Sequence, residues 1–119
     1  MCECNQFSNA VYHELLPNTF YNTLKEQEIG NWVRLFRCAD CGQLWRIDEW
    51  DKYQTQIAIK IPRTQNWESF DSSDYVKQLI FQYRGGETNE ICKMARCNKA
   101  AVKGVAFCID HLYDTGARK

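Results

Sequence analysis

The chain has 119 residues, of which 45% are hydrophobic and 25% charged, a composition typical of one folded domain with at most a small appendage. Its formal net charge is zero, which disfavours nucleic-acid binding by the whole surface, because proteins that bind in that way are usually basic. No segment approaches the roughly 20 apolar residues of a transmembrane helix, and the first ten residues lack the features of a secretory signal. We therefore expect a cytoplasmic protein that does not enter the membrane.

The seven cysteines are the most unusual feature of the composition. Because the cytoplasm keeps unbound thiols reduced, a cytoplasmic chain with this many cysteines is expected to bind metal rather than to form disulfides. An odd number of cysteines also fits poorly with a framework made only of disulfides. The sequence therefore predicts metal sites.

Alternating apolar and polar residues predict strands at 32–38, 43–47 and 53–61, which together form a three-stranded antiparallel sheet. The preceding segment, 5–31, has no clear period. Within it, 10–16 is compatible with a short helix, and 22–30 with a polar helical turn or a loop.

A helical period follows at 71–86, where the apolar residues fall at i, i+3, i+4 and i+7 and a pair of glycines ends the pattern. We expect this helix to pack on the sheet. The sequence thus predicts an α+β fold, with a zinc-ribbon-like domain at 1–91 and a C-terminal zinc finger module at 92–119 packed on it.

The last 28 residues contain the spacing C-x4-C-x10-C-x2-H. Zinc takes four ligands at tetrahedral angles, and a short spacing supplies two of them from one tight turn. Residues 98–107 are predicted to form a hairpin with its turn at Lys103-Gly104, followed by a helix that carries the last ligands. The predicted ligands of this site are Cys92, Cys97, Cys108 and His111.

A second knuckle, C-x2-C-G, lies between the first two predicted strands. The two cysteines at the N-terminus would complete its ligand set, and the residues between the two pairs are then an insertion. The predicted ligands of this site are Cys2, Cys4, Cys38 and Cys41. Seven cysteines and His111 thus provide two complete ligand sets for two structural zinc ions. The alternative is that some of these cysteines are inert buried residues, above all the N-terminal pair.

Both sets are closed and rich in thiolate, whereas a catalytic zinc keeps a position open for water. The deaminase and metalloprotease patterns are absent, and the isolated His13 is better explained as a surface or core residue. We therefore expect no enzymatic activity and no small-molecule substrate.

Aromatic residues interleaved with acids predict a surface that docks on a basic protein partner, because aromatics anchor interfaces and carboxylates steer association. The alternative is that the tryptophans belong to the core and the acids to a solvated rim. The predicted partner-binding residues are Asp48, Glu49, Trp50, Asp51, Trp67 and Glu68.

The second hypothesis is a nucleic-acid-binding regulator. Residues 1–91 carry nine basic and thirteen acidic residues, a net charge of −4, whereas 92–119 carry six and two, a net charge of +4. Basic residues near the second knuckle could contact phosphates, although they could equally solvate a small finger. These residues are Lys93, Arg96, Lys99 and Lys103.

The sequence CADCG resembles half of a zinc ribbon, and CKMARC…FCIDH resembles a treble-clef zinc finger. In size, acidity and aromatic content, with RCADCGQLWRIDEWDKY as the most characteristic stretch, the chain is similar to small bacterial immunity proteins. Those proteins bind and neutralise a cognate toxin domain. The resemblance implies a protein partner, a toxin whose basic active site the acidic and aromatic residues would cover.

Overall fold

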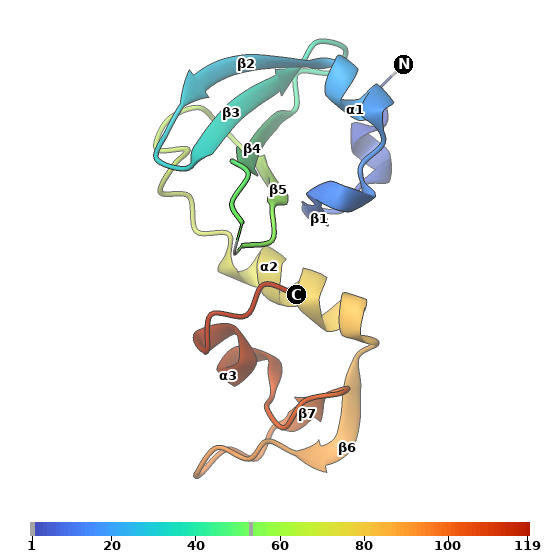
Figure 1. Cartoon of the computed structure of the whole chain (residues 1–119), viewed down its shortest axis with the longest axis vertical. Coiled ribbons are helices and arrows are strands. Elements are labelled where there is room, and N and C mark those ends of the chain that lie inside the picture. The colour runs from blue at the N-terminus through green and yellow to red at the C-terminus, as the bar shows by residue number, and fades with distance from the viewer. Residues whose placement is uncertain (1, 53) are drawn as a thin grey trace. The chain divides into compact units, whose positions relative to one another are not determined.

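The computed structural model describes residues 2–52 and 54–119, and it shows an α+β protein with one five-stranded and one two-stranded antiparallel sheet (Figure 1). The chain forms two compact units, Met1–Ser72 (unit 1) and Ser73–Lys119 (unit 2). Tyr53, the first residue of the predicted third strand, lies outside the described residues.

Unit 1 contains the larger sheet, with the strand order β1-β5-β4-β3-β2. Its strands are β1 (Ala10–Tyr12), β2 (Leu24–Ile29), β3 (Val33–Cys38), β4 (Leu44–Asp48) and β5 (Ile57–Ile61). Its helical elements are two 3-10 turns, Cys4–Gln6 and His13–Leu15, and α1 (Asn18–Asn22). Unit 2 contains α2 (Ser73–Arg84), β6 (Glu87–Ile91), β7 (Ala100–Val102) and α3 (Ile109–Asp114).

The three central strands confirm the predicted antiparallel sheet. Phe36 of β3 lies opposite Trp45 of β4, so both side chains are on the same face. The last of these strands starts later than predicted, at Ile57. The reason is a local bridge between Asp51 and Gln54, which turns the chain back before β5 begins.

The segment 5–31 is more than an insertion, because it supplies both edge strands and covers one face of the sheet. Leu16 and Phe20 pack against Trp45, and the rings of Phe20 and Trp45 lie 5.1 Å apart, edge to face. The prediction for 22–30 was wrong: most of it is β2, a strand whose residues are mainly exposed and charged. Edge strands commonly carry such charges, which discourage pairing with other chains.

The predicted helix is present as α2, and it ends at Gly85 and Gly86, whose φ angles are 97° and 93°. The sequence assigns this helix to the sheet domain, but the structure groups it with α3. Lys77 forms an ion pair with Asp110 of α3 at 3.1 Å, and Arg84 donates to the carbonyl of Lys119 at 2.7 Å. The division therefore falls before α2 rather than at 91/92.

None of the helices in the described residues has the length and apolar character that crossing a bilayer requires.

Candidate metal centres

The structure brings the eight predicted ligands together in two clusters. In each cluster, the ligand atoms all lie within 4.8 Å of one another, and all seven cysteines are free thiols. Each cluster could therefore hold one metal ion. The N-terminal cluster consists of Cys2, Cys4, Cys38 and Cys41, and the C-terminal cluster of Cys92, Cys97, Cys108 and His111.

Distances within the C-terminal cluster fit a tetrahedral ion. With Zn–S near 2.3 Å and Zn–N near 2.0 Å, the edges of the tetrahedron are about 3.8 Å for two sulfurs and about 3.5 Å for sulfur and nitrogen. The Sγ atoms of Cys97 and Cys108 lie 3.8 Å apart. Nδ1 of His111 lies 3.4 Å from the Cys92 sulfur and 3.2 Å from the Cys108 sulfur. The ring thus presents Nδ1 to the thiols.

The C-terminal ligands come from a knuckle and a helix, as predicted. The knuckle joins β6 to β7, and the amide of Cys92 donates to the carbonyl of Lys99 at 2.9 Å across its base. Cys108 directly precedes α3 and His111 lies in the first turn of that helix. The predicted hairpin differs in one respect: β7 forms its strand pair with β6, and across the predicted turn the amide of Val102 donates to the carbonyl of Phe107 at 2.8 Å. The predicted turn is present, with Gly104 at a φ of 85°.

The protein lowers the proton affinity of one C-terminal thiol. Burial raises the pKa of Cys92, but the amides of Cys108 and Met94 and the His111 ring outweigh it and bring that pKa to about 6. The pKa of Cys97 moves the other way: the amide of Lys99 lowers it, but burial and the neighbouring thiols leave it raised. One ligand is thus a thiolate near neutral pH before any metal binds.

The N-terminal cluster joins the β3–β4 hairpin to the start of the chain. Its knuckle is closed by the amide of Cys38 donating to the carbonyl of Gln43, and by the amide of Gly42 donating to the carbonyl of Cys38, both at 2.9 Å. Cys4 lies in the first 3-10 turn, is 1% exposed, and accepts a hydrogen bond from the indole Nε1 of Trp45 at 3.4 Å. Cys4 is therefore part of the core, and the partly buried Cys2 packs against it.

The proton affinities of the N-terminal thiols also diverge. Burial raises the pKa of Cys38, but hydrogen bonds from the amides of Cys41 and Asp40 and contact with the Thr23 hydroxyl outweigh it, and the pKa is about 7. Burial raises the pKa of Cys4 to about 12, against the smaller lowering by the Trp45 indole. Amides that point at sulfur are typical of knuckles and stabilise the thiolate form.

The acidic residues predicted for partner binding lie at the opposite ends of β3 and β4 from the knuckle. Asp48, Glu49 and Asp51 line a hollow of about 220 Å³ together with Trp32, a residue that sequence reasoning missed. Trp32 is 64% exposed and has a φ of 63°, a conformation that bulky residues rarely adopt. Trp50 is 72% exposed and lines an adjoining hollow of about 440 Å³.

Trp67 does not belong to this surface. Its side chain is only 6% exposed, and it lies so close to Gly30 that a Cβ there would be 2.8 Å from the ring. Arg46 holds the segment around it by donating to the carbonyls of Trp67, Glu68 and Phe70 at 3.0–3.1 Å. The prediction that Trp67 anchors a partner is therefore corrected: it is a core residue. Glu68 remains exposed and accepts a hydrogen bond from the amide of Asn31.

Two of the basic residues near the second knuckle have contacts within unit 2. Lys99 pairs with Asp110 at 2.5 Å, and the side chain of Lys103 lies against Gly85. Lys93 and Arg96 are exposed, and Arg96 has a φ of 64°. The lone histidine contributes to the fold, as expected, because the Tyr21 hydroxyl and Nδ1 of His13 form a hydrogen bond.

Comparison with known proteins gives no match to a family model, to a curated protein or to a solved structure. The functional argument therefore depends on the geometry of the chain itself.

Proposed function

We propose that the chain is a non-enzymatic protein, stabilised by two structural zinc ions, that binds another protein through the acidic–aromatic surface of unit 1. This surface consists of Trp32, Asp48, Glu49, Trp50, Asp51 and Glu68. The observation that carries the proposal is the exposure of two tryptophans beside a hollow lined by three carboxylates.

Zinc is the metal that best fits the ligands. Thiolate and imidazole in a four-ligand set are typical of structural zinc, and the distances in the C-terminal cluster match its tetrahedron. Four protein ligands leave no position for a substrate, which supports a structural role rather than a catalytic one. Bound zinc would supply folding free energy to each unit.

Exposed tryptophans on a folded surface need an explanation, because burying one contributes strongly to binding. Trp32 also keeps a left-handed backbone conformation, which costs about 1–3 kcal/mol and is common at binding sites. Its carbonyl accepts a hydrogen bond from the amide of Glu49 at 2.9 Å, so the tip of the β2–β3 hairpin is fixed beside the acids. A pre-organised aromatic and acidic surface of this kind favours a partner with a basic patch.

An immunity protein that covers the basic active site of a bacterial toxin would fit this chemistry. A toxin encoded by the neighbouring gene is the first partner to test. The second candidate function is nucleic-acid binding through the finger, and it rests on the exposed pair Lys93 and Arg96. Lys99 is already paired with Asp110, just as Glu49 of the acidic–aromatic surface is paired with Arg34, so the ion pairs do not favour one candidate function over the other.

The test compares capture of partner proteins by the zinc-loaded chain and by three variants, followed by measurement of association rates. Trp50→Ala should weaken a specific partner by about 30-fold, the effect of losing an interface anchor worth about 2 kcal/mol. Asp51→Lys should slow association, most strongly at low salt. Lys93→Glu is the matched control, a charge change in the other unit.

A partner that Trp50→Ala loses and Lys93→Glu retains supports the proposal. Equal binding by the native chain and all three variants would refute it. Steeply salt-dependent binding to DNA or RNA that only Lys93→Glu abolishes would instead favour the second candidate.

A further inference from the structure

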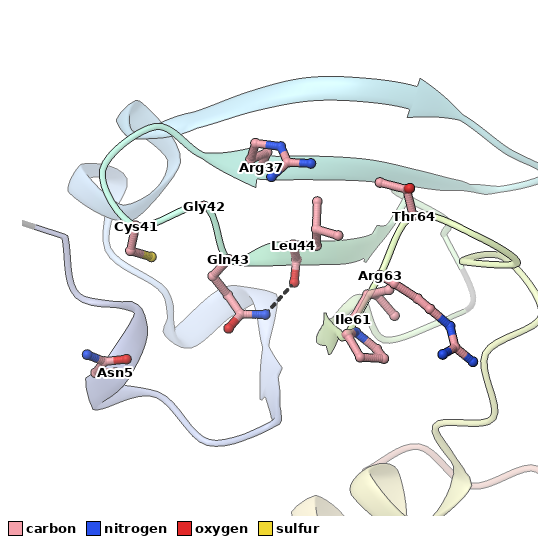
Figure 2. A pocket seen from close by; sticks show the side chains of 10 residues that line it. Asn5, Arg37, Cys41, Gly42, Gln43, Leu44, Ile61, Arg63 and Thr64 are labelled. Carbon is pink, nitrogen blue, oxygen red and sulfur yellow. Dashed lines mark hydrogen bonds between the residues drawn. The ribbon is translucent and has the colours of Figure 1, made fainter.

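A cleft of about 570 Å³ lies at the knuckle end of the sheet in unit 1 (Figure 2). Its volume is within the usual range for small-molecule sites, about 300–1,000 Å³. It lies far along β3 and β4 from the acidic–aromatic surface, and nothing in the proposed function uses it. The residues that line it are Asn5, Arg37, Cys41, Gly42, Gln43, Leu44, Ile61, Pro62, Arg63 and Thr64.

The cleft is basic within an otherwise acidic unit. Arg37 projects from β3 and Arg63 from the segment after β5, and none of the lining residues carries a carboxylate (Figure 2). Lys25 of β2 lies directly opposite Arg37 in the sheet, a pairing of like charges that destabilises a strand pair. In the part of the chain that the structure describes, no carboxylate forms an ion pair with either arginine.

The other groups on the wall suit a ligand with an anionic head and an apolar body. The Asn5 amide and the Thr64 hydroxyl can donate hydrogen bonds, and the Gln43 amide is held in place by its bond to the carbonyl of Leu44 at 2.9 Å (Figure 2). Leu44, Ile61 and Pro62 supply apolar surface. Arginine forks match the oxygens of a phosphate, and their hydrogen bonds to it are charge-assisted.

A simpler role exists for one of these residues. The Nη1 atom of Arg37 would lie 3.9 Å from a Cβ placed on Gly42, so Arg37 is near the knuckle and could balance the charge of its thiolates. That role does not account for Arg63, which comes from a different segment, or for a wall without carboxylates. Charge balance and ligand binding also predict different responses to substitution.

We propose that this cleft binds a phosphate ester of nucleotide size, with Arg37 on one side and Arg63 on the other as the anion-binding residues, their guanidinium groups lying apart (Figure 2). The phosphate belongs to a free nucleotide or to the end of a nucleic-acid strand, which share this chemistry. The proposal does not depend on the protein partner of the acidic–aromatic surface.

The experiment titrates the zinc-loaded, ¹⁵N-labelled chain with AMP, and separately with a short single-stranded oligonucleotide, at low salt. We expect saturable shifts of the Asn5, Gly42, Gln43 and Thr64 amide signals. Arg37→Gln and Arg63→Gln should each weaken binding about tenfold or more, because each loses a hydrogen bond to a charged group. Lys52→Gln, which removes an exposed positive charge from the β4–β5 connection at the other end of the sheet, is the control and should bind as the native chain does.

Shifts with AMP identify a free nucleotide as a sufficient ligand, and shifts with the oligonucleotide alone identify a strand; either result supports the proposal. The proposal would be overturned if neither ligand gave a saturable shift. It would also be overturned if both arginine variants bound the ligands as tightly as the native chain. Because both arginines are surface residues of the cleft, the variants should fold, and the dispersion of their spectra checks this. Loss of zinc from Arg37→Gln with unchanged phosphate binding would show that Arg37 serves the knuckle alone.

Discussion

The two metal clusters have similar ligands but belong to units with very different cores. The N-terminal cluster adjoins an aromatic core in which Phe7, Phe20 and Trp45 pack edge to face. In unit 2, the buried hydrophobic side chains are fewer and smaller, and two of them are ligands: Val76, Ile80, Cys92, Ala101, Val102, Cys108 and Leu112. We therefore expect bound metal to add stability to a core that is already large in unit 1, and to supply most of the stability of unit 2, whose core is small.

The largest difference should appear when the metal is removed. With a strong chelator, we expect unit 2 to unfold and unit 1 to keep its sheet, because the free energy of zinc binding is folding free energy in a unit with a small core. Amide hydrogen exchange measures this: protection should vanish at Val102 and Leu112 and persist at Leu35 and Ile59. Simultaneous loss of protection in both units would contradict the comparison.

Single substitutions should separate the clusters. Cys4→Ser should reduce the metal content from two ions to one and destabilise unit 1 by several kcal/mol, without abolishing its sheet. The matched variant Cys108→Ser should also retain one ion, but it should reproduce the unfolding of unit 2. Metal analysis combined with circular dichroism distinguishes the two. If Cys4→Ser unfolds the sheet completely, the core of unit 1 depends on its metal as well.

Acid should release the N-terminal ion first. Protons compete with metal for the ligands, so affinity falls as pH falls, about tenfold per pH unit for each proton released on binding. As the pH falls, Cys38 of the N-terminal cluster, with a pKa of about 7, takes up a proton before Cys92 of the C-terminal cluster, with a pKa of about 6. Cys4 of the N-terminal cluster, with a pKa of about 12, binds its proton more tightly than either. Metal release to a colorimetric chelator between pH 7 and 5 measures the order.

The variants Cys4→Ser and Cys108→Ser assign each release step to its cluster. Earlier release of the metal from the C-terminal cluster would show that the packing of the surrounding core determines the order of release more than the pKa values of the thiols do.

The smallest effect concerns the ion pairs of α3. Asp110→Asn removes the pairs with Lys99 and Lys77 and should destabilise metal-loaded unit 2 by at most about 1 kcal/mol, because all three groups are partly exposed. Lys99, then Lys77, lowers the pKa of Asp110, so this stability is complete above the ordinary pKa near 4 and is lost as the pH falls through the lower value.

Thermal unfolding at low and high salt checks this, with Asp114→Asn as the control. An effect that persists at high salt would indicate packing rather than charge.

Features set by local spacing could be predicted from the sequence. Both knuckles, the three central strands and α2 follow from ligand spacing and hydrophobic period over a few residues. The pairing of Cys2 and Cys4 with the distant knuckle followed from counting ligands, which works when each site is expected to have four.

Features set by distant contacts could not be predicted. β2 has no apolar alternation, because it is an exposed edge. Trp50 and Trp67 have similar acidic neighbours in the sequence. Trp67 is buried, in a segment that Arg46 holds by hydrogen bonds, whereas Trp50 is exposed. The unit boundary reflects an ion pair and a hydrogen bond of α2 with residues more than 30 positions later.

The span of the N-terminal cluster has a consequence for the order of events during synthesis. Its ligands are complete once Cys41 has been made, whereas β5 comes later in the chain and lies between β1 and β4. An ion captured at that stage would tether the first residues to the β3–β4 hairpin before their sheet partner exists. Closing this loop of some 35 residues carries only a modest entropic penalty, since that penalty grows slowly with length. The bound ion would then keep the N-terminal residues close to the β3–β4 hairpin until β5 has been synthesised and can pair between β1 and β4.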